Sequence, residues 1–157
     1  MGFHDSMPWT GAGTIELVKG RMDSKQYIEI LDRKLLPMLD AVSITPGAPQ
    51  RHEIIFQQDN DPKHTSKLTK AWFKKNKIEP LTWPANSPDI NPIEHMWGAL
   101  KRRLAAYDTD PRGANELWDR VQKEWANLTV AEAQKLIESM PRRCAAVVAA
   151  KGGNTKY

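Results

Sequence analysis

Residues 53–66 read EIIFQQDNDPKHTS, and this stretch decides the fold class. It opens with a compact apolar run, IIF, which is bounded by polar residues and is typical of a buried strand. The run leads into Asp61 and Pro62, an N-cap residue followed by a proline that suits the first position of a helix. We therefore predict a strand over 53–58 and a helix that ends near Asn76.

Further elements follow on both sides of this stretch. On the C-terminal side, 78–83 has the pattern of a strand, and we expect it at a sheet edge because Pro80 has no amide to donate to a ladder. On the N-terminal side, 14–18 alternates loosely and is predicted to be a short strand. Apolar residues then recur at helical intervals, so a helix is predicted over 24–40, with its last turn bent at Pro37.

The rest of the chain is predicted to be mostly helical. Residues 1–13 contain breakers and are expected to be irregular. One further helix is expected to begin at Asn91-Pro92, and a second to carry Leu117 and Trp125. A third is expected to open at a capping box formed by Thr129 and Glu132, and a fourth to start at Pro141. The order strand, helix, strand, helix, strand and then helices predicts an α/β layer fold with parallel pairing of the later strands. The length predicts a single domain, 1–157.

Composition excludes several classes of protein. The chain has 157 residues, with 23 Lys plus Arg against 19 Asp plus Glu, a surplus of +4 that permits a nucleic-acid partner without requiring one. A single cysteine, Cys144, excludes an internal disulfide and a cysteine-based zinc site, and fits a reducing compartment. The apolar runs are too short to cross a bilayer and no leader precedes the chain, so we expect neither a membrane protein nor a secreted one.

Two carboxylates are candidates for metal ligands. Asp59 follows the predicted strand 53–58, and Glu94 lies in the first turn of a later helix, with thirty-four residues between them. One strand-helix-strand unit could return the chain to the same sheet edge, where two carboxylates would suit Mg²⁺. The alternative is purely structural, because Asp is common in turns and a Glu at this position completes a cap and complements the helix dipole.

Polar and basic residues surround both acids. His64 and His95 are close to them in sequence, and a histidine in the first turn of a helix is more often a surface residue than a ligand. The remaining candidates are basic residues in the two helices that start beside the acids: Lys63, Lys67, Lys101, Arg102 and Arg103. A solvated helix face is the usual reason for such residues, but they would also suit DNA phosphates if the acids bind metal.

Two long motifs now bring in a known family. FQQDNDPKHTS (56–66) and WPANSPDINPIEHMWGALKRRL (83–104) resemble the catalytic domain of mariner-superfamily transposases of the DDE type. The gap between Asp59 and Glu94 matches that family's spacing between its second Asp and its Glu. GRMDSKQYIEIL (20–31) and MPRRCAAVVAAKGGNTKY (140–157) are similar to the same family, so the resemblance covers nearly the whole chain.

The resemblance implies an RNase H-like fold and Mg²⁺- or Mn²⁺-dependent cutting of DNA at transposon ends, followed by attack of the freed 3′-hydroxyl on target DNA. Asp59 matches the second acid of the triad and Glu94 the third, while Asn60 and His64 match the motif around the second acid, which implies at most a positioning role. DNA is the implied partner, a homodimer is left open, and the nucleus of a eukaryotic host is the implied compartment.

The sequence departs from the family's pattern at its N-terminal end. The family's first Asp lies on the first strand of the sheet, upstream of the stretch that Gly11 and Gly13 resemble, and Asp5 is in the wrong place to match it. We therefore expect an N-terminally truncated RNase H-like domain with extra C-terminal helices. Three hypotheses stay open: part of a DNA transposase, a catalytically inactive nucleic-acid-binding or interaction module, and a fragment without a stable fold.

Overall fold

The structure is a computed structural model that describes residues 2–5, 13–18, 20–44, 46–47, 49–85, 87–151, 153 and 155–156, the side chains of 2–5 and 51 excepted. The chain divides into two compact units. Unit 1 comprises Met1–Lys19 and Ser87–Tyr157, and unit 2 comprises Gly20–Asn86. Each unit is described by itself, and the single domain over 1–157 stays a prediction.

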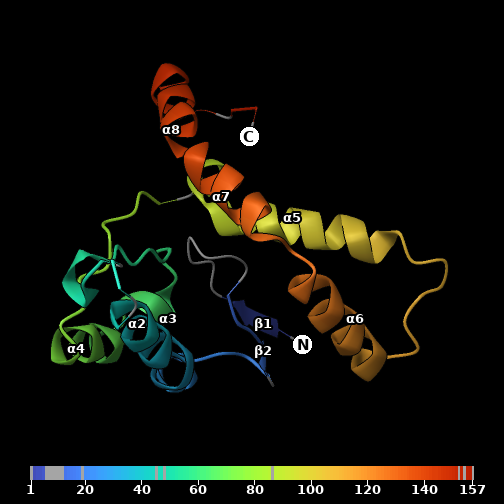
Figure 1. Ribbon diagram of the computed structural model, residues 1–157, viewed down its shortest axis with the longest axis horizontal. Coiled ribbons are helices and arrows are strands. Elements are labelled where there is room, and N and C mark those ends of the chain that lie inside the picture. The colour runs from blue at the N-terminus through green and yellow to red at the C-terminus, as the bar shows by residue number, and fades with distance from the viewer. Residues whose placement is uncertain are drawn as a thin grey trace. The chain divides into compact units, whose positions relative to one another are not determined.

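Unit 2 is mainly helical (Figure 1). Its elements are α1 (Ser24–Ile30), a π-helical turn (Leu31–Leu35), α2 (Leu36–Ser43), a 3₁₀ turn (Arg51–Glu53), α3 (Pro62–Thr65) and α4 (Lys67–Lys75). The helix predicted over 24–40 is confirmed, since α1, the π-helical turn and α2 form one continuous rod. Its start is fixed by the side chain of Asp23, which accepts hydrogen bonds from the backbone N–H of Lys25 at 3.0 Å and of Gln26 at 2.9 Å.

Pro37 distorts the turn of helix that precedes it and not the turn that follows it. We predicted a bend in the last turn, but α2 continues to Ser43, and the irregularity is the π-helical turn just upstream. A proline has no N–H for the carbonyl four residues earlier, and its ring crowds that carbonyl. The wider turn, closed by the N–H of Leu36 on the carbonyl of Leu31, absorbs this mismatch without breaking the rod.

The strands predicted over 53–58 and 78–83 are wrong in extent. In the described residues they are reduced to one bridge between Phe56 and Pro80, in which the N–H of Leu81 donates to the carbonyl of Phe56 at 2.8 Å. The parallel direction is the predicted one. The ladder cannot grow past Pro80 on its other side, because proline has no amide to donate there.

The helix predicted from residue 62 to 76 is interrupted at Ser66. The Ser66 side chain caps α4 by accepting from the N–H of Thr69 at 3.1 Å. The buried hydroxyl of Thr69 donates to the carbonyl of Lys63 at 2.7 Å, which ties α4 to α3. Both ends of the prediction are confirmed, with Asn76 as the C-cap.

The core of unit 2 lies between α4 and the helical rod. Its buried residues are Tyr27, Leu31, Leu35, Leu39, Trp72 and Phe73. Ile54, Phe56 and Ile78 pack against this core from the two bridged segments. The apolar run Ile54-Ile55-Phe56 therefore packs one face against helices, although it forms only a single bridge.

Unit 1 combines a two-stranded sheet with the C-terminal helices. Its elements are β1 (Gly2–Asp5), β2 (Ile15–Val18), a 3₁₀ turn (Pro88–Ile90), α5 (Pro92–Ala105), α6 (Ala114–Ala126), α7 (Val130–Glu138) and α8 (Met140–Ala149). The helices predicted for this region are all confirmed. Figure 1 shows α5 and α6 lying next to each other, and α7 also contacts α5.

The N-terminal strands pair antiparallel. Gly2 lies opposite Val18 and Asp5 opposite Ile15, so the strand predicted over 14–18 is confirmed and the irregular segment predicted over 1–13 is wrong for its first described residues. The extended backbone there comes from pairing with β2, which a four-residue stretch without clear alternation does not reveal. The part of that prediction that falls on 6–12 lies outside the described residues.

The core of unit 1 is separate from that of unit 2. Its buried residues are Met96, Leu100, Val121, Trp125, Leu128 and Ala133. The indole N–H of Trp125 donates to the carbonyl of Gly13 at 2.9 Å, which ties the N-terminal segment to α6. Among the described residues, no helix has the length and apolar character needed to cross a membrane.

The predicted capping box at the start of α7 is confirmed and offers a test of stability. The N–H of Glu132 donates to the hydroxyl of Thr129 at 3.2 Å, and the N–H of Thr129 donates back to the Glu132 carboxylate at 2.7 Å. Although partial burial acts to raise it, these bonds and the nearby Arg103 hold the pKa of Glu132 below its usual value. The stabilisation is therefore lost as the pH falls through that lowered pKa.

We expect Thr129→Ala to lower the free energy of unfolding by about 1 kcal/mol at neutral pH. The N–H of Glu132 loses its acceptor, and the Glu132 carboxylate loses the hydrogen bond from the Thr129 hydroxyl. Urea denaturation measures the change, and Thr82→Ala at an exposed position is the matched control. Equal unfolding free energies for the two variants would contradict the role assigned to the box.

Candidate active site

Asp59 presents an exposed carboxylate three residues after the bridge at Phe56. The side chain is 55% exposed, and its Oδ1 accepts from the N–H of Asp61 at 3.0 Å and from Nδ1 of His64 at 2.6 Å. Among the described residues, no hydrogen bond reaches the second oxygen, Oδ2. The carboxylate is thus held through one oxygen and open to a ligand through the other.

The imidazole of His64 is the inner support of Asp59. The side chain is 13% exposed, and its ring lies 4.3 Å from the ring of Tyr27. Burial lowers the pKa of His64, and it outweighs the opposing attraction of Asp59. A neutral ring that donates from Nδ1 to Asp59 leaves Nε2 as a lone pair, and this buried atom has no hydrogen-bond partner in the described part of the chain.

Tyr27 and Gln58 complete the support behind His64. The Tyr27 hydroxyl donates to Oε1 of Gln58 at 2.6 Å, and Nε2 of Gln58 donates to the carbonyl of His64 at 3.3 Å. Burial, with the charge of Asp59, raises the pKa of Tyr27, so the phenol stays a donor. Neither residue was predicted from the sequence, and the only signal for Gln58 is its place beside Asp59.

Asn60 and Asp61 fix the loop that carries Asp59. Nδ2 of Asn60 donates to the carbonyl of Trp83 at 2.7 Å, which joins this loop to the segment after the bridge. The Asp61 side chain caps α3 through the N–H of Lys63 at 3.0 Å and also pairs with Nζ of Lys63 at 2.6 Å. Although partial burial acts to raise it, Lys63 holds the pKa of Asp61 below its usual value.

Glu94 lies in unit 1, in the first turn of α5, and its side chain is exposed. Its N–H donates to the carbonyl of Asn91 at 3.2 Å, and the Asn91 side chain makes no capping hydrogen bond to the helix. The next residue, His95, accepts at Nε2 from the guanidinium of Arg143. Burial, reinforced by the charge of Arg143, lowers the pKa of His95.

The basic candidates differ in what they contact. Lys67, Lys101 and Arg102 are exposed. Lys63 is paired with Asp61, and Arg103 is paired with Glu132 at 2.8 Å. Three of the five residues predicted to contact DNA are therefore exposed cations. The other two form ion pairs with acids of their own unit.

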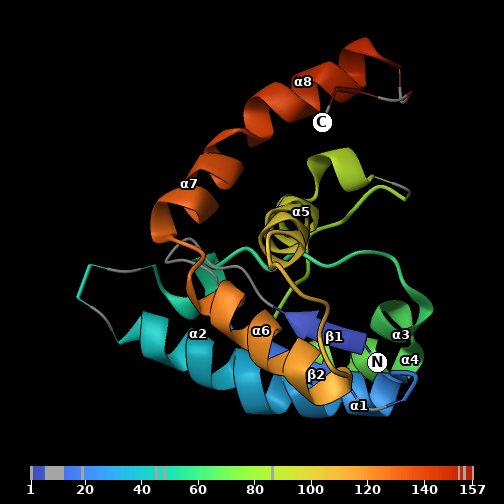
Figure 2. The ribbon, with the colours of Figure 1, turned by 90° about the vertical axis from the view of Figure 1, so that its right-hand side faces the viewer.

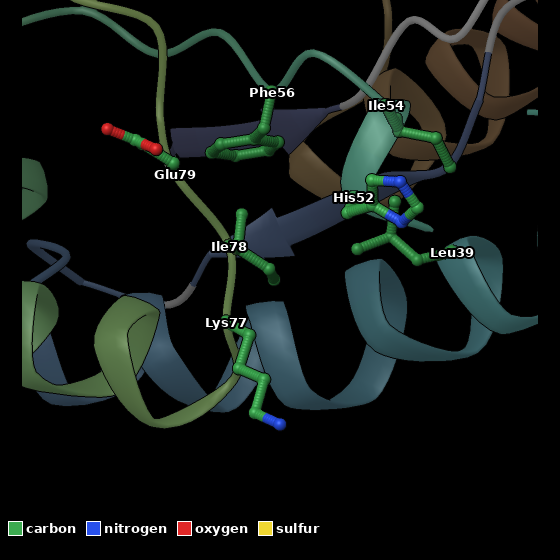
Figure 3. A pocket seen from close by; sticks show the side chains of 7 residues that line it. All are labelled: Leu39, His52, Ile54, Phe56, Lys77, Ile78 and Glu79. Carbon is green, nitrogen blue, oxygen red and sulfur yellow. The ribbon is translucent and has the colours of Figure 1, made fainter. Parts of the chain in front are cut away.

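A shallow pocket lies elsewhere in unit 2 and does not include Asp59. Figure 3 shows its apolar side chains, among them Leu39, Ile54 and Phe56, with the charged side chains of Lys77 and Glu79 also on its wall. The imidazole of His52 also lines it, and none of the predicted site residues does.

The donor chemistry of the two acids suits a hard cation. Carboxylate oxygens are the ligands that Mg²⁺ prefers, and both Asp59 and Glu94 offer exposed carboxylates. Among the described residues, no group of three or more His, Cys, Asp or Glu side chains gathers as a metal site. Each of the two carboxylates by itself therefore has the donor chemistry of a Mg²⁺ ligand.

Comparisons with known proteins point to one family. Residues 10–112 match the family described as DDE superfamily endonuclease. The chain is 40% identical over 148 residues to the Tcb1 transposase of Caenorhabditis briggsae and 38% identical over 148 residues to the Tc1 transposase of Caenorhabditis elegans. Each match covers 94% of this chain and 51% of the relative, so the chain spans about half the length of the curated relatives it matches.

Solved structures agree on the fold. The chain is similar to the Mos1 transposase catalytic domain solved with Raltegravir and Mg, with a TM-score of 0.79 and 20% identity, over 94% of this chain and 73% of that one. The same domain solved with Mn gives a TM-score of 0.79 and 22% identity, over 94% and 74%. The predicted RNase H-like fold, with added C-terminal helices, is thereby confirmed.

Proposed function

This chain belongs to the DDE superfamily of endonucleases, and from that premise we propose that it is part of the catalytic domain of a Tc1/mariner-type DNA transposase. The reaction of such a protein would be metal-dependent DNA cleavage and strand transfer, leading to DNA integration. The observation that carries the proposal is the Asp59 carboxylate, which is 55% exposed and is held at Oδ1 by the largely buried imidazole of His64.

Asp59 and Glu94 would be the residues that hold Mg²⁺ or Mn²⁺. When bound, the metal would activate the attacking oxygen and stabilise charge on the phosphodiester. The chain's own groups prepare the acids: His64 donates to Asp59 and fixes its orientation, and Asn60 anchors the loop to Trp83. His64 and Asn60 are therefore proposed as positioning residues.

We further propose that the first acid of the triad does not come from this chain. The resemblance puts that Asp on a strand upstream of the stretch around Gly11 and Gly13, where Asp5 does not match it, and two carboxylates compensate less of the charge of two divalent ions than three do. The expected behaviour of the isolated chain is binding of metal and DNA without strand transfer.

The alternative function is a catalytically inactive transposase-derived module that binds nucleic acid or another protein. Mn²⁺ binding detected by electron paramagnetic resonance separates the two, because a module without a working acid site needs no metal. The proposed function expects binding that is lost in Glu94→Gln and kept in Glu138→Gln, an exposed control on α7. Metal binding that is unchanged in Glu94→Gln contradicts the proposed function. Strand transfer by the chain alone contradicts the proposal that the first acid does not come from this chain.

DNA is the proposed partner of the basic helices, and α4 gives the clearest test. Lys67, Lys70 and Lys74 are exposed on it at spacings of three and four residues, so they share one helix face. No ion pair in the described part of the chain neutralises them. The predicted contacts Lys101, Arg102 and Arg103 on α5 remain part of the proposal.

We expect the triple change Lys67→Gln, Lys70→Gln and Lys74→Gln to weaken DNA binding and to flatten its salt dependence. Each lost phosphate contact lowers the slope of log K against log salt by about 0.9, so the full loss is about 3. Fluorescence anisotropy from 50 to 200 mM salt measures this, since over that range a slope difference of about 3 corresponds to a change of about 50-fold in affinity. The matched control neutralises the exposed Lys25, Lys135 and Lys151. An equal slope change in the control would contradict a phosphate track on α4.

A nuclear location and pairing with a second copy also belong to the proposal. A transposase acts on chromosomal DNA, which in a eukaryotic host lies in the nucleus. Sedimentation of the chain with and without DNA tests the homodimer, and a monomer under both conditions would contradict it.

A further inference from the structure

The start of α5, which carries Glu94, receives contacts from distant parts of the sequence. The helix begins with Pro92 at a favoured position, and the Asn91 side chain makes no capping hydrogen bond to the helix. Contacts from the C-terminal part of unit 1 reach this turn across 48 to 66 residues of sequence. Figure 2 shows α8 passing beside the 3₁₀ turn that leads into α5.

Arg143 on α8 is the centre of these contacts. The residue is 5% exposed, which is rare for arginine unless its donors are satisfied. Its Nε donates to the hydroxyl of Ser139 at 2.6 Å, and Nη1 donates both to the carbonyl of Asp89 at 3.0 Å and to Nε2 of His95. The planar guanidinium thus fixes α8, the turn before α5 and the first turn of α5 relative to one another.

The chain's C-terminal segment adds a second tie to the same turn. Oδ2 of Asp89 accepts from the N–H of Thr155 at 3.1 Å and from its hydroxyl at 2.6 Å. These bonds and the charges of His95 and Arg143 hold the pKa of Asp89 below its usual value, although desolvation acts to raise it. The carbonyl of Asp89 is therefore hydrogen-bonded to α8, and its carboxylate is hydrogen-bonded to the C-terminal segment.

This arrangement serves orientation more than stability. A surface helix start needs only a side-chain cap, whereas a buried guanidinium carries a desolvation cost and requires every donor to be matched. Arginine also imposes directions that lysine cannot, because its donors lie in one rigid plane. Such a device suits a turn whose exact position matters, and the exposed functional group on that turn is Glu94.

We propose that Arg143, Asp89 and Thr155 form a latch that positions Glu94 for metal binding. They are positioning residues, since none of them offers a free ligand to the metal. This inference rests on the proposed function for the use of Glu94, and on the contacts of unit 1 for the latch itself.

The test compares two latch variants with one control. Arg143→Lys keeps the charge but cannot make the three bonds together, and Thr155→Val removes the hydroxyl donor while keeping the side-chain shape. Arg142→Ala, at the exposed neighbouring arginine, is the matched control. Hydrogen exchange of the backbone amides of residues 93–96 reads the latch, and the Mn²⁺ dissociation constant reads its effect on Glu94.

Both latch variants should speed exchange at 93–96 about tenfold and weaken Mn²⁺ binding about 10- to 100-fold, the range found when groups that orient a metal ligand are removed. Arg142→Ala should change neither. Thr155→Val alone is sufficient if Arg143→Lys does not fold.

Exchange that is unchanged, or that rises evenly across unit 1, would overturn the latch, since a merely structural role acts on the whole unit. Faster exchange with unaltered Mn²⁺ affinity would overturn its link to Glu94. If the unaltered chain binds no Mn²⁺, the proposed function fails, and the exchange rates still decide whether the latch exists.

Discussion

Asp59→Asn should weaken Mn²⁺ binding at least about 100-fold while leaving the fold intact. A neutral amide removes one full charge and one hard oxygen from the site, and even indirect changes around metal ligands cost about 10- to 100-fold in affinity. The replacement keeps the side-chain shape, and its remaining oxygen can still accept from the N–H of Asp61 and from His64. Electron paramagnetic resonance titration of Mn²⁺ measures the loss.

Global stability should hardly change in this variant. Asp59 is more than half exposed, and substitutions at such positions usually alter the free energy of unfolding by about 0.5 kcal/mol or less. Asp108→Asn, at another exposed aspartate, is the control for removal of one negative charge. If both variants bind Mn²⁺ like the parent chain, Asp59 is not a metal ligand and the proposed function loses its main support.

Leu100→Ala should lower the free energy of unfolding by about 2–5 kcal/mol, which is the usual range for a fully buried leucine. Leu100 is 1% exposed and lies in the core of unit 1 among Met96, Val121 and Trp125. The truncated side chain leaves a cavity that the packed helices α5 and α6 cannot close completely. For a chain of this size, each kcal/mol lowers the melting temperature by about 2–4 °C.

Urea denaturation followed by tryptophan fluorescence suits this measurement, because Trp125 is buried in the same core. Leu68→Ala on α4 is the matched control, since that leucine is 49% exposed and alanine favours a helix. A loss below about 1 kcal/mol in Leu100→Ala would mean that unit 1 is less tightly packed than its burial indicates.

Local signals in the sequence predicted the helices well. Asp23, Asp61 and Thr129 each cap a helix with bonds that span two or three residues, so the residues concerned are adjacent in sequence. The π-helical turn before Pro37 and the break at Ser66 were not predicted. Both depend on how the backbone satisfies its hydrogen bonds around one residue, which periodicity does not show.

Pairing between segments was harder to predict. The stretch EIIF has the composition of a strand, but its extent depends on a partner, and the pairing with 78–83 amounts to one bridge between Phe56 and Pro80. The opposite is true of β1. Its short sequence has no strand pattern, and it is a strand because it pairs with β2. In both cases long-range pairing, and not local preference, decided the outcome.

The candidate site divides in the same way. Asp59, Asn60 and His64 lie within six residues, so the motif could suggest all three, and the structure brings Asp59 and His64 into contact. Tyr27 reaches the site from thirty-one residues before Gln58, and Arg143 reaches His95 across forty-eight. No spacing rule connects such positions, because only the folded chain brings them together.

The order of synthesis gives the two units different histories. Unit 2 is one uninterrupted stretch, so it leaves the ribosome ahead of α5 to α8 and can form its core before they emerge. Unit 1 is built from two stretches. The hydrogen bond from Trp125 to the carbonyl of Gly13 can form only after another 112 residues have been synthesised. We expect a chain truncated after residue 110 to contain a protease-resistant segment 20–86 beside an unprotected N-terminal segment, because α6, which β2 contacts in the full chain, is missing from it.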